Sequence, residues 1–238
     1  MKFSIITLFP EVFEPILNSS ILKRAQSKGL VEFELINLRD FGQGPHQVVD
    51  DRPYGGGAGM VLKADVLAKA VTKIKKLRLK ISSKSSISNL QSLVVLASAS
   101  GKPYSQKKAR ELSKLNHIIL VCGHYEGVDQ RFIDKYVDEE ISIGDYVLTG
   151  GEVPVMAIVD SITRLIPGVL EKEEATLNES FENGLLEHPQ YTRPDEFEGQ
   201  KVPEILLSGN HGEVDKWRQQ KSAEKTKKNR PDLLNKNE

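Results

Sequence analysis

Short apolar runs, two of which end in small residues, constrain the fold of this chain more than any other feature. They are FSIITLF at 3–9, SLVVLAS at 92–98 and HIILVCG at 117–123. Continuous runs of this length, rich in β-branched side chains, are typical of strands buried on both faces of a parallel sheet. VEFELINL from Val31 predicts another strand, and the stretch 141–147 predicts a further short one.

Segments with helical spacing of apolar residues separate these strands. They lie near 16–22, from 61 to about 79, and from about 153 to 165. The Gly, Pro and Asp content of Asp40–Gly59 predicts a loop. The Ser-rich segment Lys80–Gln91 predicts a mobile surface loop. Strands alternating with helices predict an α/β fold, in which a mostly parallel sheet is flanked by helices.

The composition changes after Ile166-Pro167-Gly168, where LEKEEATLNESFE is charged and poor in large apolar residues. Such a segment predicts a linker. We therefore expect an α/β domain at 1–168, a flexible linker at 169–178 and a small helical domain at 179–238 that contains Trp217.

Composition excludes several classes of protein. Lys and Arg together number 33, as do Asp and Glu, so bulk charge gives no argument for nucleic-acid binding and basic residues would have to cluster. No stretch approaches the roughly 20 apolar residues that span a bilayer. The chain has a single cysteine, which permits no intramolecular disulfide. The histidines of the chain are scattered and make no zinc site. The sequence predicts a cytoplasmic protein without a membrane partner.

Several glycine-rich loops are candidates for ligand binding. DRPYGGGAGM at 51–60 matches neither the phosphate-loop pattern nor the GxGxxG fingerprint, and glycine runs are more often flexible turns. The loops 96–101, 122–129 and 142–152 each supply glycines or small residues after an apolar run, which lets backbone amides approach a ligand. Three such loops after parallel strands predict a cofactor pocket at the carboxyl edge of the sheet.

Six motifs together make the chain resemble the tRNA (guanine-N1)-methyltransferase family. They follow the family's order over nearly the whole chain, and are DRPYGGGAGM, LVCGHYEGVDQR, SIGDYVLTGGE, RLIPGVL, SF-x-x-GLL-x-x-PQYTRP and LLSGNH. The resemblance implies an S-adenosylmethionine-dependent enzyme that methylates N1 of guanosine 37 of tRNA, immediately 3′ of the anticodon, and so prevents frameshifting. It also implies a C-terminal trefoil knot in the α/β domain, a rare exception to unknotted chains. The domain at 179–238 is then the tRNA-binding domain.

The resemblance also assigns binding residues. In such a family, S-adenosylmethionine lies bent in the knot, and the implied cofactor-binding residues are Leu96, Ala97, Ser98, Gly123, Tyr125, Glu126, Gly127, Ser142, Ile143, Gly144, Tyr146, Leu148, Gly150 and Gly151. The implied substrate-binding residues are Asp50, Arg52, Tyr54, Gly55, Gly57, Gly59, Tyr191 and Arg193. The family forms homodimers whose active sites are shared between subunits.

Methylation of guanine N1 requires a base for the N1 proton and a cation for the charge that develops toward O6. The resemblance assigns the cation to Arg164 and the base to Glu179, where the family has aspartate. Outside these motifs, an arginine at a helix end would simply cap carbonyls, and a glutamate in an acidic linker would be solvated. Mg²⁺ is a further implied cofactor, with Glu126 as its candidate contact and Glu187 nearby in the family pattern.

Basic residues form three groups, at 73–84, at 102–110 and in the tail at 221–230. For the first group we favour a solvated helix face, and for the tail we favour RNA contact. Two other functions remain open. One is a knotted methyltransferase that acts on ribose or on rRNA, and the other is an RNA-binding protein without catalysis, which only the glutamate at 179 supports.

Overall fold

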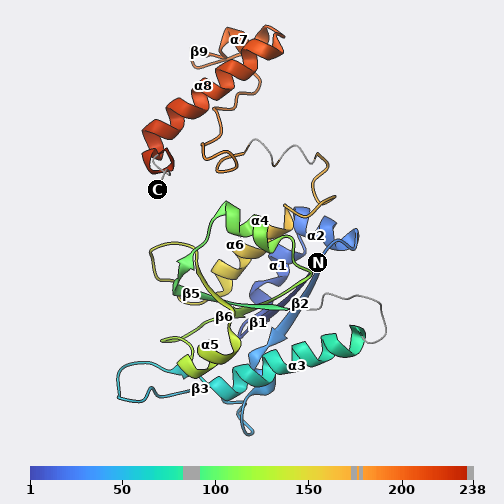
Figure 1. Cartoon of the computed structure of the whole chain (residues 1–238), viewed down its shortest axis with the longest axis vertical. Helices are drawn as coiled ribbons and strands as arrows, with labels where there is room; N and C mark the ends of the chain where they lie inside the picture. The colour runs from blue at the N-terminus through green and yellow to red at the C-terminus, as the bar shows by residue number, and fades with distance from the viewer. Residues whose placement is uncertain (83–91, 173–175, 177–178, 235–238) are drawn as a thin grey trace. The chain divides into compact units, whose positions relative to one another are not determined.

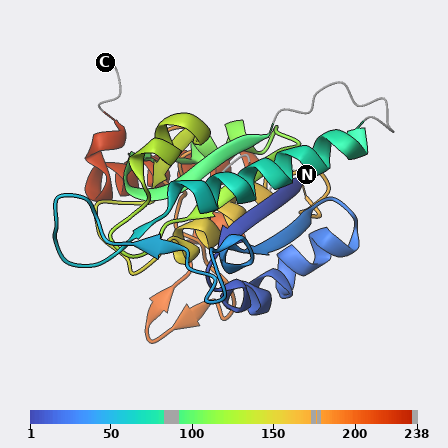
Figure 2. The ribbon, with the colours of Figure 1, turned by 90° about the horizontal axis from the view of Figure 1, so that it is seen from below.

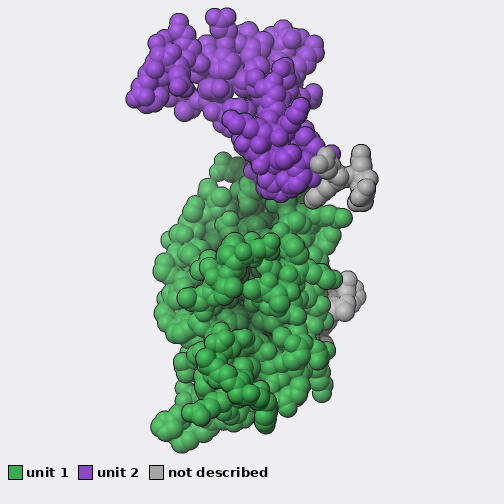
Figure 3. All heavy atoms as spheres, turned by 90° about the vertical axis from the view of Figure 1, so that its left-hand side faces the viewer, with its two compact units in different colours: residues 1–171 green, residues 172–238 purple. Residues whose placement is uncertain are grey.

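The computed structural model describes residues 1–82, 92–172, 176 and 179–234. These residues divide into two compact units, Met1–Glu171 and Lys172–Glu238, which are coloured separately in Figure 3. The first unit continues past the expected start of the linker at 169, because Val169 is buried against the first unit's core.

A five-stranded sheet forms the centre of the first unit, in the order β2-β1-β6-β5-β7 (Figure 1). All its strand pairs are parallel, and its strands are β1 (Lys2–Thr7), β2 (Glu32–Asn37), β5 (Leu93–Pro103), β6 (His117–Cys122) and β7 (Glu139–Ser142). This confirms the prediction of an α/β fold with a parallel sheet. The apolar runs become strands because both faces of the sheet are covered, so that every residue of β6 is buried.

Helices cover the two faces of the sheet and define two cores. Alternate residues of β6 enter opposite cores, with Ile118 and Leu120 on one face and Ile119 and Val121 on the other. Figure 2 shows helices on both sides of the strands. The core containing Ile118 is covered by α1 (Glu14–Leu17), α2 (Ser20–Ser27), α4 (Gln106–Leu112) and α6 (Glu152–Thr163), and the other core by α3 (Ala64–Ser82) and α5 (Gln130–Tyr136).

The structure corrects several of the predicted boundaries. The segment expected to be helical from 61 begins instead with a short strand, β4 (Val61–Leu62), which pairs antiparallel with β3 (Asp50–Asp51) inside the predicted loop. Helix α3 extends to Ser82, so the first three residues of the predicted loop at 80–91 are helical, and the rest lie outside the described residues. Two 3₁₀ turns, η1 (Pro10–Val12) and η2 (Leu38–Phe41), complete the first unit.

Strand β5 is longer than its apolar run, because a bulge between Ala97 and Lys102 lets the chain pair with β7 again from Lys102 to Pro103. Gly101 allows this close approach, since a Cβ there would lie 2.5 Å from the backbone nitrogen of Ile141.

The second unit contains the helices α7 (Glu204–Leu207) and α8 (His211–Asn229) and the turn η4 (Pro231–Leu233). Its hairpin of β8 (Glu196–Phe197) and β9 (Gln200–Lys201) was missed by the prediction of a purely helical domain. The Trp217 ring of α8 lies 6.2 Å from that of Tyr191, so an aromatic contact packs the irregular segment against the helix. No described helix has the length and apolarity needed to cross a bilayer.

Candidate functional site

Three loops at the carboxyl edge of β5, β6 and β7 surround a cavity of about 430 Å³. Its size is within the range of small-molecule pockets. Every residue that the resemblance implies for cofactor binding lines this cavity, from Leu96, Ala97 and Ser98 through Gly123, Tyr125, Glu126 and Gly127 to Ser142, Ile143, Gly144, Tyr146, Leu148, Gly150 and Gly151. The fold therefore brings these residues together, although they span more than fifty positions of the chain.

Close backbone approach at Gly151 explains why a glycine pair begins α6. A Cβ on Gly151 would lie 2.7 Å from the Cα of Cys122, and a Cβ on Gly150 would collide with the His124 ring. The Gly151 N–H donates to the carbonyl oxygen of Gly123 at 2.8 Å. The loop that ends at Gly151 is thus held directly against the loop that follows β6.

A buried carboxylate beneath the cavity was missed by the sequence analysis. Glu152 accepts a hydrogen bond from the Thr7 hydroxyl at 2.7 Å through Oε1, and its Oε2 lies 3.1 Å from Nε2 of His124. Only 7% of Glu152 is exposed, so this carboxylate needs both partners to offset the loss of water. The His124 ring thus hydrogen-bonds to the first residue of α6. An acidic residue directly after a glycine pair was the only available signal for Glu152.

The thiol of Cys122 lies at the end of β6 and is buried. Burial raises the pKa of this thiol well above its ordinary value, and the nearby Glu152 carboxylate adds to the rise. A thiol held in its neutral form is a poor nucleophile.

The glycine-rich loop at 51–60 is joined to the edge of the same cavity. The Glu126 N–H donates to the carbonyl oxygen of Met60 at 3.0 Å, and the Leu62 N–H donates to that of Gly127 at 3.0 Å. Gly59 has a positive φ of 82°, and a Cβ there would collide with the Glu126 side chain. Glycine is therefore required where this loop meets Glu126.

The residues predicted to bind substrate fall in both units. Asp50 lies in β3, Arg52 and Tyr54 follow it, and the glycines at 55, 57 and 59 form the exposed loop beyond. Tyr191 and Arg193 lie in the second unit.

The two residues predicted to carry the chemistry also lie one in each unit. The Arg164 N–H donates to the carbonyl oxygen of Asp160 at 3.2 Å and closes the last turn of α6. The Glu179 carbonyl oxygen accepts from the N–H of Glu182 at 3.3 Å, in a turn of the second unit.

The metal candidate Glu126 lines the cavity, and Glu187 lies in the second unit. Across residues 1–82, 92–172, 176 and 179–234, no three His, Cys, Asp or Glu side chains converge as a metal-binding group. Protein ligands from this part of the chain would therefore need oxygens of bound molecules to complete a coordination shell.

Comparison with known proteins identifies the family. The family model described as tRNA (Guanine-1)-methyltransferase TrmD matches residues 1–236. The tRNA (guanine-N(1)-)-methyltransferases of Anoxybacillus flavithermus and Dictyoglomus turgidum are each 52% identical, over 98% and 99% of this chain and 91% of their own lengths. The Bacillus subtilis protein of the same name is 49% identical over 98% of this chain and 92% of its own length. The chain therefore belongs to the tRNA (guanine-1)-methyltransferase family.

Proposed function

We propose that this chain transfers the methyl group of S-adenosylmethionine to N1 of guanosine 37 of tRNA, immediately 3′ of the anticodon. One observation carries the proposal: in a member of this family, three loops distant in sequence meet around one cavity at the carboxyl edge of a parallel sheet. The methylated nucleoside would prevent frameshifting during translation.

The lining of the cavity fits S-adenosylmethionine. Backbone groups of the loops can read the adenine edge, and the partly exposed rings of Tyr125 and Tyr146 offer apolar surface to the base. The Glu126 carboxylate can offset the positive sulfonium. When bound, the cofactor supplies an electrophilic methyl group. Glu126 is also the proposed contact for Mg²⁺, with the remaining oxygens coming from cofactor or RNA.

The chemistry at guanine requires one proton to be removed and one charge to be stabilised. We assign the proton to the Glu179 carboxylate, which would accept it from N1 as the N1–methyl bond forms and the sulfur keeps the electron pair of the broken bond. The Arg164 guanidinium would face O6, where negative charge develops during this loss. The side chain of glutamate ends in the same carboxylate as that of aspartate but is one methylene longer. The backbone at position 179 must therefore lie further from N1.

We further propose a homodimer with shared active sites. Glu179 belongs to the second compact unit, whereas the residues proposed to bind the cofactor belong to the first. In a shared site, the second unit of a partner subunit would supply Glu179 to the cofactor bound by the first unit. The second unit would bind tRNA through Tyr191, Arg193 and the basic tail. Such a site would form in the cytoplasm, where tRNA is modified.

The close approach of Gly151 to the Gly123 backbone supports one more feature. Two loops that follow different strands can run this close where one threads the other, as the proposed trefoil knot requires. The knot would hold the cofactor in a bent conformation.

A single-turnover methylation assay tests the function. The purified chain, S-adenosylmethionine labelled in its methyl group, Mg²⁺ and a tRNA transcript with G at positions 36 and 37 should yield N1-methylguanosine at position 37. The same transcript with A at position 37 is the control and should remain unlabelled. Label on ribose or only on rRNA would favour the alternative enzymes, and cofactor binding without any transfer would favour a non-catalytic RNA-binding protein.

Mixing two inactive variants tests the shared site. Glu179→Ala and Gly127→Trp affect different units, so an equimolar mixture should recover about a quarter of wild-type activity if subunits exchange freely and one intact site forms per heterodimer. A mixture as inactive as its components, despite heterodimers detected by differential tags, would contradict sharing.

A further inference from the structure

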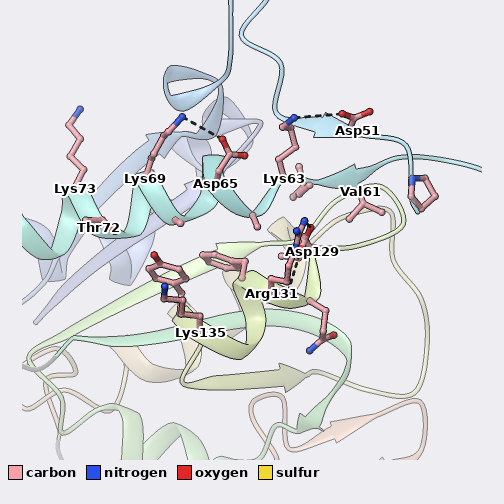
Figure 4. A pocket seen from close by; sticks show the side chains of 18 of the residues that line it. Asp51, Val61, Lys63, Asp65, Lys69, Thr72, Lys73, Asp129, Arg131 and Lys135 are labelled. Atoms are coloured by element: carbon pink, nitrogen blue, oxygen red, sulfur yellow. Dashed lines mark hydrogen bonds and ion pairs between the residues drawn. The ribbon is translucent and has the colours of Figure 1, made fainter. Parts of the chain in front are cut away.

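A second, larger cavity of about 1690 Å³ lies between α3 and α5 and shares Val128 and Gln130 with the cavity formed by the three loops (Figure 4). Its floor is apolar, with Phe132 stacked on Tyr136 at 5.6 Å between ring centroids. Residues 51–54, which lead into the glycine-rich loop, close one end. The cavity therefore adjoins the glycine-rich loop that we predicted to bind substrate.

Positive side chains dominate the rim of this cavity. Of its lining residues, seven are Lys or Arg and three are Asp. Each aspartate already pairs with one cation: Asp51 with Lys63 at 3.6 Å, Asp65 with Lys69 at 3.5 Å and Asp129 with Arg131 at 2.6 Å. The excess positive charge therefore comes from cations beyond these three pairs.

The remaining cations are Arg52, Lys73, Lys76 and Lys135, and none forms an ion pair with any described residue. Figure 4 shows Lys73 on α3 and Lys135 on α5, the two helices that flank the cavity. Lys73 and Lys135 lie over aromatic rings, of Phe41 at 5.1 Å and Tyr136 at 5.8 Å, which orders their side chains near the rim.

Helical periodicity separates these lysines from their neighbours in sequence. Lys69, Lys73 and Lys76 line the cavity along one face of α3, whereas Arg78 is half-buried and its charge acts on the N-terminal amine at the opposite edge of the sheet. Seven residues of helix span about 10 Å. This face is therefore long enough to meet more than one phosphate of an RNA strand.

We propose that the cavity between α3 and α5 binds the sugar–phosphate backbone of the tRNA substrate outside the methylated nucleotide, with Lys73, Lys76 and Lys135 contacting phosphates. This inference rests on the proposed function, because that function supplies the polyanion. Tyr54, whose side chain is 98% exposed at the end of the cavity, provides a ring on which an unpaired base can stack. The exposed lysines of this helix, which we expected from the sequence to form a solvated face, would on this proposal contact RNA.

A second copy of this chain is a less suitable occupant. In a two-fold symmetric contact the same rim would face itself, and the excess lysines of one copy would repel those of the other. RNA brings the complementary charge.

The test compares two triple variants in the full-length chain. One is Lys73→Gln/Lys76→Gln/Lys135→Gln, and the matched control is Lys23→Gln/Lys107→Gln/Lys114→Gln, which removes three exposed lysines from the helices and turns over the opposite face. The dissociation constant of an unmodified tRNA transcript with G at 37 is measured between 50 and 300 mM KCl.

For the cavity variant we expect roughly a tenfold or greater loss of affinity at 150 mM KCl. Its slope of log K against log salt should fall by about 2, since each phosphate contact contributes roughly 0.7–0.9. The control should retain both the affinity and the slope of the unaltered chain. An affinity within twofold of the unaltered chain, or an equal loss in the control, would overturn the proposal.

Two further measurements keep the outcomes distinct. If the triple variant unfolds at a lower temperature, Lys76→Gln and Lys135→Gln are measured singly, and each should lower the slope by about 0.7–0.9. An altered oligomeric state of the variant in sedimentation would show that the cavity seats a second copy and would overturn the proposal. If the unaltered chain binds tRNA through this rim but transfers no methyl group, the proposed function fails and the cavity assignment stands.

Discussion

Acidification should destabilise the first unit through one buried histidine. His117, at the start of β6, is 1% exposed, and its Nε2 and Nδ1 lie 2.9 Å and 2.7 Å from the hydroxyl oxygens of Ser4 and Ser92. The Ser4 hydroxyl donates its hydrogen to Glu34, so Nε2–H donates to Ser4 and Nδ1 accepts from Ser92. The neutral ring is therefore fully hydrogen-bonded.

Burial lowers the pKa of His117 from 6.5 to about 4, and the charges of Arg78 and Lys2 add to the shift. The unfolded chain then binds a proton near pH 6.5, whereas the folded chain does not until about pH 4. Stability is therefore complete above pH 6.5 and is lost as the pH falls toward 4. Linkage gives a loss of about 2 kcal/mol between pH 7.5 and pH 5.

Urea unfolding at the two pH values, followed by far-ultraviolet circular dichroism, measures this loss. Fluorescence is unsuitable, because the single tryptophan, Trp217, belongs to the second unit. His117→Gln removes the titration and should flatten the dependence on pH, while the exposed control His46→Gln should retain it. A wild-type loss below about 0.5 kcal/mol, or the same pH dependence in His117→Gln, would refute the reasoning.

Three other perturbations have defined outcomes. Glu179→Gln keeps the shape of the side chain but removes its basicity, so single-turnover methylation should slow by a factor of about 10²–10⁴ with unchanged cofactor affinity, and a near-normal rate would exclude Glu179 as the base. Glu152→Ala leaves the Thr7 hydroxyl and His124 without their buried acceptor and should lower the free energy of unfolding by about 3 kcal/mol in urea titrations, whereas unchanged stability would show that water replaces the carboxylate. Cys122 should react with iodoacetamide at least about a hundredfold more slowly in the native chain than in urea, as followed by mass spectrometry, and equal rates would contradict its burial.

The central strands could be predicted from the sequence because a completely buried strand requires a continuous run of apolar residues. Residues 118–122 are apolar throughout, and a strand covered on both faces demands this composition. The loops around the cavity at the carboxyl edge of the sheet were predictable for a related reason, since small residues directly follow such strands. The backbone hydrogen bond between Gly151 and Gly123 brings two of these loops together. It depends on tertiary packing, so the sequence of neither loop predicts it.

Features that depend on contacts between distant residues could not be predicted. Thr7 and Glu152 are 145 positions apart, and nothing local to either residue indicates their hydrogen bond. The extension of β5 through Gly101 was hidden because its bulge contains Ser, Gly and Lys, which are rare in buried strands. The separation of Lys73 and Lys76 from Arg78, by contrast, follows from a period of 3.6 residues and was available in the sequence.

The strand order has a consequence for synthesis on the ribosome. Strand β1 lies between β2 and β6, and Lys2 is aligned with His117, so its second edge stays unpaired until more than a hundred further residues have been made. At roughly 5–20 residues per second, this apolar edge waits on the order of ten seconds. During that interval a nascent chain is prone to aggregate and is a natural client for chaperones that shield hydrophobic segments.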